Sequence, residues 1–548
     1  MQQMAIQTGR PVTMASRGIV AAPHYLAAEA GTWALQQGGN AVDAAIASSA
    51  VLCVVEPHMA GLGGDATLMV WQPGRGQPLC LNGSGAAGGR ASVEYYRDRG
   101  HDAVPARGVL AASTAPGAVA AWGDVHGRWG ALAWEELFEP ALHYAESGFP
   151  VSAQLARRLA QAQPLLERSE GTAAIFLREG APYAEGETLV QRDLARSLES
   201  LAADGASTLY TGDLAAAIAD DLERRGGLLS RSDLAGHHSA WVAPLRTAYR
   251  GRTLYELPPN TLGPAAMLTA NLLEGWDVAA MGDQGAVYYH TMAEVAKISL
   301  ADGGAWPADP AFVAASLERL LSKEHAERRR TQVQASRARP LADYAEWAQQ
   351  AVCPLPPLTG TAAVVAVDAG GLAVSLVQSL HADFGSGVVA GDSGILLHSS
   401  GAGFDLDPAS PNRLEPHKRP VQALLPAMLF AGERPWLVFG ASGGVAQPQI
   451  HAGLLTRLAD LGQNVQQAIE APRWRYEAAG DGGMGTLNIE GRVADSVLRQ
   501  LREMGHEVRA VDDWAEMMGQ AQGVVVDRER GILAGGADPR GDGQAIGW

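Results

Sequence analysis

The hydrophobic pattern of the chain alternates between strand-like and helix-like segments. Residues 18–22 and 362–367 are short, continuous apolar runs of the kind that buried strands contain. Residues 24–37 and 41–55 have the length of helices, and the second is so rich in Ala and Ser that it predicts an internal helix. From about residue 118 to residue 302 helical periodicity dominates. The pattern therefore predicts an α/β protein.

The run at residues 362–367 carries the candidate chemistry. A turn at 368–371 and a second apolar run at 372–377 follow it, so it predicts a hairpin. Immediately before it stands Thr361, preceded by Gly360. If the bond between them is cut, the new amine, with a pKa of about 8, lies beside the threonine hydroxyl and serves as its base. Gly360 suits such a cut because glycine permits strained backbone geometry. The alternative is an ordinary threonine that starts a strand.

Composition and charge exclude some partners. The chain has 548 residues and a formal net charge of −17 at pH 7, which argues against nucleic acid or an anionic membrane, since both need a basic face. Cys53, Cys80 and Cys353 stand in apolar contexts without metal-ligand spacing and predict buried thiols in a reducing compartment. The first ten residues lack a signal-peptide core, so we expect a cytoplasmic protein.

Two features invite a cofactor or metal assignment. Residues 83–88 fit Gly-x-Gly-x-x-Gly after a predicted strand at 78–82, but the acidic residue of a dinucleotide site is missing. His237 and His238 are adjacent, without a matching acid or histidine spacing. We therefore predict neither a cofactor nor a metal ion.

Two serines compete with Thr361 for the role of nucleophile. Ser442 lies in Gly-x-Ser-x-Gly between a predicted strand and a predicted helix, and Asp460 and His506 follow in the order of an α/β-hydrolase triad. That pattern is short, and glycine-rich chains produce it readily. Ser393 lies in Gly-Asp-Ser-Gly, but the all-β pattern and disulfides of a chymotrypsin-like protease do not accompany it.

From residue 361 to residue 397 the sequence resembles the small subunit of the γ-glutamyltransferase family, and the spacing to Phe384-Gly385-Ser386-Gly387 is kept without a gap. Residues 37–45, 55–58 and 61–65 resemble the N-terminal signature of the same family. Its members are N-terminal-nucleophile (Ntn) hydrolases, made as one precursor that cuts itself before this threonine. The resemblance implies a four-layer αββα sandwich with mixed or antiparallel central sheets. It also implies a large chain, 1–360, that pairs with a small chain, 361–548.

The same resemblance assigns catalytic roles. It makes Thr361 the residue that attacks an amide, while its own amine accepts the proton. The backbone amides of Gly443 and Gly444 hold the oxyanion, and Ser379, placed like the family's second hydroxyl, orients the Thr361 amine. Water, or an amine in a transferase, then resolves the acyl-enzyme.

The substrate-binding positions depart from those of the family's transpeptidases. A γ-glutamyl group carries an α-carboxylate and an α-ammonium, and each needs a charged partner when it is buried. In place of the arginine, asparagine, aspartate and paired serines of those enzymes, this chain has Ser84, His381, Gly403, and Gln422 with Ala423.

This loss of charge predicts an amidohydrolase for a small carboxylated acyl amide, such as oxamate or a glutaryl or cephalosporin side chain, all substrates known within the family. His381 and Gln422 either bind the smaller carboxylate or are plain structural polar residues. A true γ-glutamyltransferase or glutathione hydrolase, and a non-catalytic relic on this fold, remain as alternatives.

Overall fold

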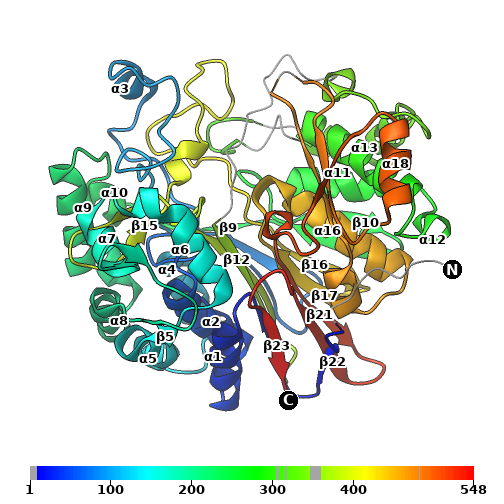
Figure 1. Ribbon diagram of the computed structural model, residues 1–548. Helices are drawn as coiled ribbons and strands as arrows, with labels where there is room; N and C mark the ends of the chain where they lie inside the picture. The colour runs from blue at the N-terminus through cyan, green and yellow to red at the C-terminus, as the bar shows by residue number, and fades with distance from the viewer. Residues whose placement is uncertain (1–8, 304–307, 315–316, 346–359, 481) are drawn as a thin grey trace.

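Two seven-stranded sheets lie at the centre of the protein (Figure 1). The computed structural model describes residues 9–303, 308–314, 317–345, 360–480 and 482–548. The first sheet has the order β23 (Gln544–Gly547), β2 (Ile19–Ala22), β12 (Thr361–Val367), β13 (Ala373–Ser379), β3 (Asp65–Trp71), β4 (Leu79–Asn82) and β9 (Ala240–Val242). The second has the order β1 (Thr13–Ala15), β22 (Ile532–Ala537), β21 (Ala521–Asp527), β17 (Arg434–Ala441), β16 (Pro426–Ala431), β11 (Arg252–Glu256) and β10 (Leu245–Tyr249).

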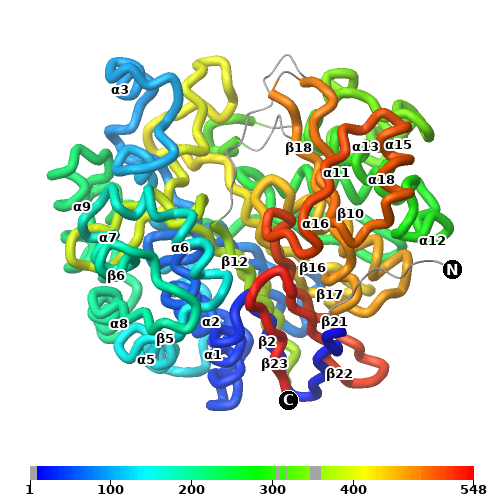
Figure 2. The backbone as a smooth tube through the Cα atoms, viewed as in Figure 1, coloured from blue at the N-terminus to red at the C-terminus, as the bar shows by residue number. Residues whose placement is uncertain are grey.

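Both sheets are antiparallel at every strand pair described. A parallel pair occurs in a separate three-stranded sheet of β18 (Trp474–Glu477), β19 (Thr486–Glu490) and β20 (Glu507–Val511), where β19 pairs with β20. Each central sheet combines strands from before and after residue 361. Figure 2 shows this in the first sheet, where the early strand β2 lies between β12 and the C-terminal strand β23.

Helices cover the outer face of each central sheet (Figure 1). On the first sheet lie α1 (Tyr25–Gln36), α2 (Ala41–Val55) and α4 (Ala118–Trp129), and further out α5 (Glu139–Ser147), α6 (Ala153–Leu166), α8 (Arg192–Asp204) and α9 (Asp213–Arg224). On the second lie α11 (Gly263–Leu273), α16 (Gln447–Leu455) and α17 (Val465–Glu470), with α13 (Ala286–Gly303) and then α18 (Asp495–Glu503) outside them. Short helices fill the remainder: α3 (Val93–Arg97), α7 (Glu170–Phe176), α10 (Arg231–Ala235), α12 (Val278–Met281), α14 (Leu317–Leu320) and α15 (Lys323–Arg330).

Strand β12 is buried on both faces. Val364 packs with the helices of the first sheet, whereas Val365 and Val367 pack with Phe430 and Val438 of the second sheet. Successive residues of a strand point to opposite faces, so burial on both faces requires the continuous apolar run that the sequence has. Each fully buried valine or phenylalanine contributes roughly 1.5–3 kcal/mol relative to exposure.

Helix α2 confirms its prediction in detail. It runs from Ala41 to Val55, every residue in it is buried, and Asn40 forms a capping box with Asp43. A capping box satisfies two backbone donors at the helix start, which explains why the boundary was readable from the sequence.

Two local predictions are wrong. The alternating apolar and polar residues at 245–257 predict one strand, but the structure has the hairpin of β10 and β11 there, because Arg250 and Gly251 both adopt positive φ (51° and 74°) and turn the chain. The charged run Arg328-Arg329-Arg330 predicts a solvated face, but Arg329 of α15 lies 2.8 Å from Asp302 in an ion pair that is inaccessible to solvent.

The remaining expectations concern cysteines and connecting segments. Cys53 and Cys80 are buried free thiols as predicted. Cys353 lies outside the described residues, and so does the proline-rich segment 352–359, which the sequence predicts to be a pliable tether before the cleavage site. Within the described part of the chain, none of the helices has the length and apolar character needed to cross a bilayer.

Candidate active site

Thr361, Ser379 and Asp65 lie side by side on three neighbouring strands. Thr361 of β12 pairs directly with Ser379 of β13, which in turn pairs with Asp65 of β3. Directly opposite residues project from the same face of a sheet. Because Thr361 has the same parity along β12 as Val365, all three side chains face the second sheet. They are only 1%, 4% and 0% exposed, respectively.

The peptide bond before Thr361 is intact in this structure, and short contacts surround it. The Ser379 hydroxyl donates to the Gly360 carbonyl oxygen at 2.5 Å, and the Leu380 N–H donates to the same oxygen at 3.0 Å. Thr361 Oγ1 lies 3.0 Å from Ser379 Oγ, and the His381 N–H donates to Ser379 Oγ at 2.7 Å. The predicted nucleophile, the predicted second hydroxyl and the predicted cleavage site therefore lie within one hydrogen-bonded group.

Gly360 is needed for room rather than for an unusual backbone conformation. A Cβ there would lie 2.5 Å from the Ala382 carbonyl oxygen and 2.8 Å from that of His58, both backbone atoms. Its φ is not positive, so the left-handed conformations that favour glycine play no part. Any side chain at position 360 would displace the backbone around the Gly360–Thr361 bond.

Gly443 and Gly444 follow β17, and Gly443 borders a cleft of about 730 Å³. Both have positive φ, 129° and 58°. A Cβ at Gly443 would lie 2.9 Å from Ile450 Cδ1, so glycine is required there by conformation and by space. The cleft is lined by Ser442, Gly443, His58 and Asp383 among others. The Gly443 backbone thus lies beside an opening that solvent reaches, and an oxyanion site needs backbone donors in such a position.

Asp65 is a central acceptor that the sequence analysis did not single out. Its carboxylate accepts from Gly85 N (2.9 Å), Ser400 Oγ (2.9 Å) and Gln422 Nε2 (2.8 Å), and His398 Nδ1 lies 3.2 Å away. His398 Nε2 contacts the Thr114 carbonyl oxygen at 2.9 Å. These donors come from three separate segments, at Gly85, at His398 with Ser400, and at Gln422, so one buried carboxylate fixes the loops around Thr361.

The Asp65–His398 pair is ionic. Burial alone would raise the pKa of Asp65, but His398 and the other donors outweigh it and hold that pKa below its ordinary value. Burial likewise disfavours protonated His398, yet the Asp65 carboxylate and the Thr114 carbonyl raise its pKa above the ordinary value. The pair stabilises its own charges, so it remains ionised in the protein interior.

The five predicted substrate-binding residues all lie near the Asp65–His398 pair, but they differ in whether their polar groups already have hydrogen-bond partners. The Ser84 hydroxyl donates to Asn82 Oδ1 at 2.7 Å, and Gln422 donates its amide to Asp65. The Ala423 carbonyl accepts a hydrogen bond from the Gln447 side chain. Ser84, Gln422 and Ala423 therefore support the walls of the site through bonds they already make.

His381 and Gly403 face each other and leave a polar atom without a partner. His381 Nε2 is buried and has no hydrogen-bond partner, while its Nδ1 lies 3.3 Å from Ser399 Oγ. A Cβ at Gly403 would lie 3.5 Å from that free nitrogen. Burial, helped by the nearby charge of His398, lowers the pKa of His381 to about 3, so the ring is neutral at pH 7. It offers one unused hydrogen-bonding group beside the site.

The alternative triad of Ser442, Asp460 and His506 is contradicted by the structure. Ser442 Oγ accepts from the Gln520 N–H, and Asp460 binds Tyr249 and Arg250. His506 instead contacts His290. Each member has a different partner, so the correct order in the sequence reflects no shared site.

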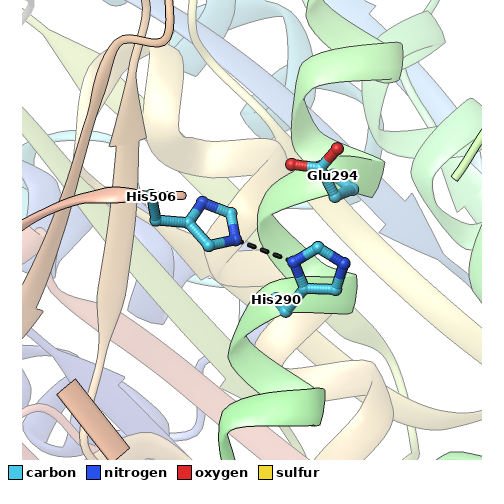
Figure 3. A group of neighbouring side chains, drawn as sticks. All are labelled: His290, Glu294 and His506. Atoms are coloured by element: carbon cyan, nitrogen blue, oxygen red, sulfur yellow. Dashed lines mark hydrogen bonds between the residues drawn. The ribbon is translucent and has the colours of Figure 1, made fainter. Parts of the chain in front are cut away.

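His290, Glu294 and His506 form a separate titratable cluster whose ligand atoms lie within 4.8 Å of one another (Figure 3). His290 Nε2 contacts the Gln334 carbonyl oxygen at 2.7 Å and must therefore donate its hydrogen there. His290 Nδ1 is then the acceptor for His506 Nε2 at 2.8 Å. Glu294 accepts from Lys297 at 2.7 Å. Since each group already has a partner, the cluster joins α13 to the segment before β20 by hydrogen bonds.

Comparisons with known proteins agree with this geometry. The sequence profile described as gamma-glutamyltranspeptidase matches residues 27–548. The chain is 41% identical to a glutathione hydrolase-like proenzyme, YwrD, of Bacillus subtilis over 97% of this chain and 98% of that protein. It is 34% identical to an oxamate amidohydrolase proenzyme of Klebsiella pneumoniae over 98% and 99% of the two chains.

A solved structure shows the same fold. The cephalosporin acylase from Bacillus halodurans superposes with a TM-score of 0.89 at 33% identity, covering 100% of this chain and 99% of that one. Sequence and fold agree over essentially the whole length, and this chain belongs to the gamma-glutamyltranspeptidase family.

Proposed function

We propose that the chain is a self-processing amidohydrolase with an N-terminal threonine nucleophile, built as the four-layer αββα sandwich of Ntn hydrolases. The observation that carries the proposal is the contact between the Thr361 hydroxyl, Ser379 and the Gly360 carbonyl at the head of β12. The relatives named above are proenzymes, which supports processing of this chain. Cleavage after Gly360 would give chains 1–360 and 361–548, which share both sheets and would stay paired.

In the proposed reaction, Thr361 Oγ1 attacks the substrate amide and its freed amine accepts the proton. The Gly443 and Gly444 amides hold the oxyanion, and Ser379 orients the amine. Water then releases the acyl group. Positive φ at both glycines and the place of Gly443 beside the cleft support this role.

We propose a small carboxylated acyl amide as the substrate. Among the described residues around Thr361, Asp65 is the buried carboxylate, and four donors already occupy its oxygens. A substrate ammonium would have to displace one of them, which costs about 1–3 kcal/mol for each unpaired buried group. His381 Nε2, by contrast, is free to donate to an acyl oxygen. The site therefore favours an acyl group without an α-ammonium, as in the oxamate amidohydrolase relative.

A γ-glutamyl substrate is the second candidate, because the Bacillus subtilis relative is described as glutathione hydrolase-like. To distinguish the two substrate classes, kcat/KM is measured for oxamate, glutaryl amides and γ-glutamyl anilide on one preparation of processed enzyme. We expect oxamate or a glutaryl amide to be preferred. A γ-glutamyl compound that is turned over at least as efficiently would overturn the substrate proposal but not the nucleophile.

The nucleophile is tested on the full chain by mass spectrometry. We expect the wild-type protein to consist of chains of 360 and 188 residues (548 minus 360), with Thr361 as a free N-terminus. Thr361→Ala should remain a single inactive chain, whereas Ser442→Ala should be cut normally. An active wild-type protein with residue 361 still joined to residue 360 would refute the proposal. An uncut and inactive wild-type chain would favour the non-catalytic relic.

We also propose a cytoplasmic location, on the ground that Cys53 and Cys80 are free thiols. Cell fractionation with an antibody against the small chain checks this, and recovery in the periplasmic or secreted fraction would contradict it.

A further inference from the structure

We propose that the amine half of the substrate carries an anionic group such as a carboxylate, and that an arginine-lined pocket beside the cleft binds it. This arginine pocket has a volume of about 320 Å³, and its charged lining residues are Arg107, Arg158, Arg168 and Asp383. The proposal rests on the proposed amidohydrolase function and adds to it the chemical class of the amine that is released.

The arginine pocket has an excess of positive charge, although the whole chain has a formal net charge of −17. Arg158 pairs with the Asp383 carboxylate at 3.1 Å and with the Glu516 carboxylate at 2.7 Å. Glu516 is shared with Arg157, which lies 2.6 Å from it. One carboxylate in the pocket cannot neutralise three guanidinium groups, so the pocket favours an anion from outside.

Arg107 presents a guanidinium that is held in place without losing its charge. Its Nη1 donates to the Asp383 carbonyl oxygen at 2.5 Å and also to the Gly385 carbonyl oxygen. These two bonds use one end of a fork that has five N–H donors. Burial and the nearby charge of Arg168 lower the pKa of Arg107, although the Asp383 charge raises it. A bound anion would therefore stabilise the charged form of Arg107.

The other two arginines also have donors to spare. Arg158 Nε is buried and has no hydrogen-bond partner. Arg168, in the turn after α6, is exposed, and within the described part of the chain its side chain makes neither a hydrogen bond nor an ion pair. A carboxylate accepts two parallel N–H bonds from one guanidinium, so these arginines suit it in geometry as well as in charge.

The arginine pocket adjoins the cleft that Gly443 borders. Arg158, Gln161 and Asp383 line both the pocket and the cleft of about 730 Å³. His58 lines the cleft as well, and its carbonyl oxygen lies 2.8 Å from the position of a Cβ at Gly360. A substrate whose carbonyl lies at the proposed nucleophile can thus extend along the cleft into the pocket.

His58 offers polar groups along this path. Both of its ring nitrogens are buried without a hydrogen-bond partner. Burial, with the nearby charges of Arg158 and His24, lowers the pKa of His58 to about 3, so the ring is neutral at pH 7. A neutral imidazole has one donor and one acceptor, which suits the uncharged polar middle of a substrate rather than its anionic end.

The acyl half is assigned to a different place. His381 Nε2 is proposed to hold the acyl group, and neither His381 nor Gly403 is among the described residues that line the cleft or the arginine pocket. The two halves of an amide leave the carbonyl carbon in opposite directions, so the amine half points into the cleft. That cleft has room for far more than ammonia, the amine that oxamate releases.

The test compares two amides of one acyl group, oxalyl or glutaryl, whichever the processed enzyme hydrolyses faster. The amine is either 3-aminobenzoate, which carries a carboxylate, or aniline, which is neutral. We expect Arg168→Ala to lower the ratio of kcat/KM for the 3-aminobenzoate amide to kcat/KM for the anilide by about tenfold, the effect of one lost charge-assisted hydrogen bond. Because the ratio is compared between enzymes, the different chemical reactivity of the two amides cancels.

The matched control is Arg231→Ala, which also removes an exposed arginine, one that pairs with Asp220 away from both openings. It should leave the ratio unchanged, and Arg168→Ala should leave kcat/KM for the anilide unchanged. An unchanged ratio in Arg168→Ala, or an equal fall in Arg231→Ala, would overturn the arginine pocket while the proposed function stands. An equal loss on both amides in Arg168→Ala would place the acyl carboxylate in the pocket and overturn the assignment to the amine half. A wild-type protein that hydrolyses neither amide would overturn the proposed function, and the pocket with it.

Discussion

Replacing Asp65 by asparagine tests whether one buried carboxylate holds the site together. The substitution is best made in the uncut Thr361→Ala chain, so that unfolding concerns a single polypeptide. Asn keeps the size of the side chain but has one acceptor oxygen instead of two. If that oxygen faces Ser400, Gln422 and His398, the new NH2 group faces the Gly85 N–H, and two donors then oppose each other.

The expected loss of stability is large. An unpaired buried N–H costs about 1–3 kcal/mol. Removing one partner of a buried ion pair costs about 3–5 kcal/mol, because the remaining charge is uncompensated. His398 limits the total by losing its proton, so we expect a decrease of about 3–5 kcal/mol in the free energy of unfolding. That is a large share of the 5–15 kcal/mol typical of a folded domain.

The loss of stability caused by Asp65→Asn should depend on pH in a direction that the two pKa shifts define. The pKa of Asp65 is lowered from 3.8, so its contribution is present above that value and is lost as the pH falls through the folded-state pKa. The pKa of His398 is raised from 6.5, so its contribution is complete below 6.5 and is lost as the pH rises through the folded-state pKa. The difference between parent and variant should therefore be greatest between about pH 4 and 6.5.

Urea unfolding followed by tryptophan fluorescence, repeated across pH, measures the effect. The control is Asp193→Asn, since the Asp193 carboxylate pairs with Arg196 and both side chains are exposed. Its loss should stay below about 1 kcal/mol. A change of less than 1 kcal/mol for Asp65→Asn, or an equal loss at every pH, would refute the reasoning.

Three further predictions follow from single contacts. Gly360→Ala should slow self-cleavage, because its Cβ would lie 2.5 Å from the Ala382 carbonyl oxygen; normal cleavage on a denaturing gel would contradict this. Glu56→Gln should stabilise the protein by about 3 kcal/mol at pH 7. The reason is that burial raises the pKa of the Glu56 carboxyl, which has no hydrogen-bond partner, to about 8. The stabilisation by Gln should therefore grow as the pH rises from about 4.5, and a difference in the free energy of unfolding in urea that does not change with pH would contradict the prediction. His506→Ala should destabilise the processed pair by about 1–3 kcal/mol, since His290 Nδ1 loses its donor; unchanged dissociation of the two chains in urea would argue against it.

The strand arrangement would hold the chain together as one protein after the proposed cut. Strand β12 begins at Thr361 and pairs with β2 from the opposite side of the proposed cut. Each central sheet contains strands from both sides, so cleavage leaves the hydrogen-bond ladders and the cores on either face intact.

Some features could be read correctly because their causes are local. The boundary of α2 depends on Asn40 and Asp43, three residues apart, and its burial on the Ala-rich sequence itself. The β12–β13 hairpin follows from two apolar runs separated by a Gly-rich turn. Conversely, Arg250 is not a typical turn residue, so the break between β10 and β11 left no clear signal.

The amino-acid sequence by itself determined the α/β class and the β12–β13 hairpin, because strand periodicity and turn residues act over short distances. The cleavage before Thr361 and the oxyanion role of the glycines after β17 follow from the family resemblance and stay predictions. Only the tertiary structure decided the strand register that sets Asp65 beside Ser379. It also brings His398 into contact with Asp65, although the two are more than 300 residues apart in the sequence. It also separated Ser442 from His506 and buried Arg329 against Asp302. Sequence patterns record what each segment prefers, whereas pairing of buried charges depends on which distant segments meet.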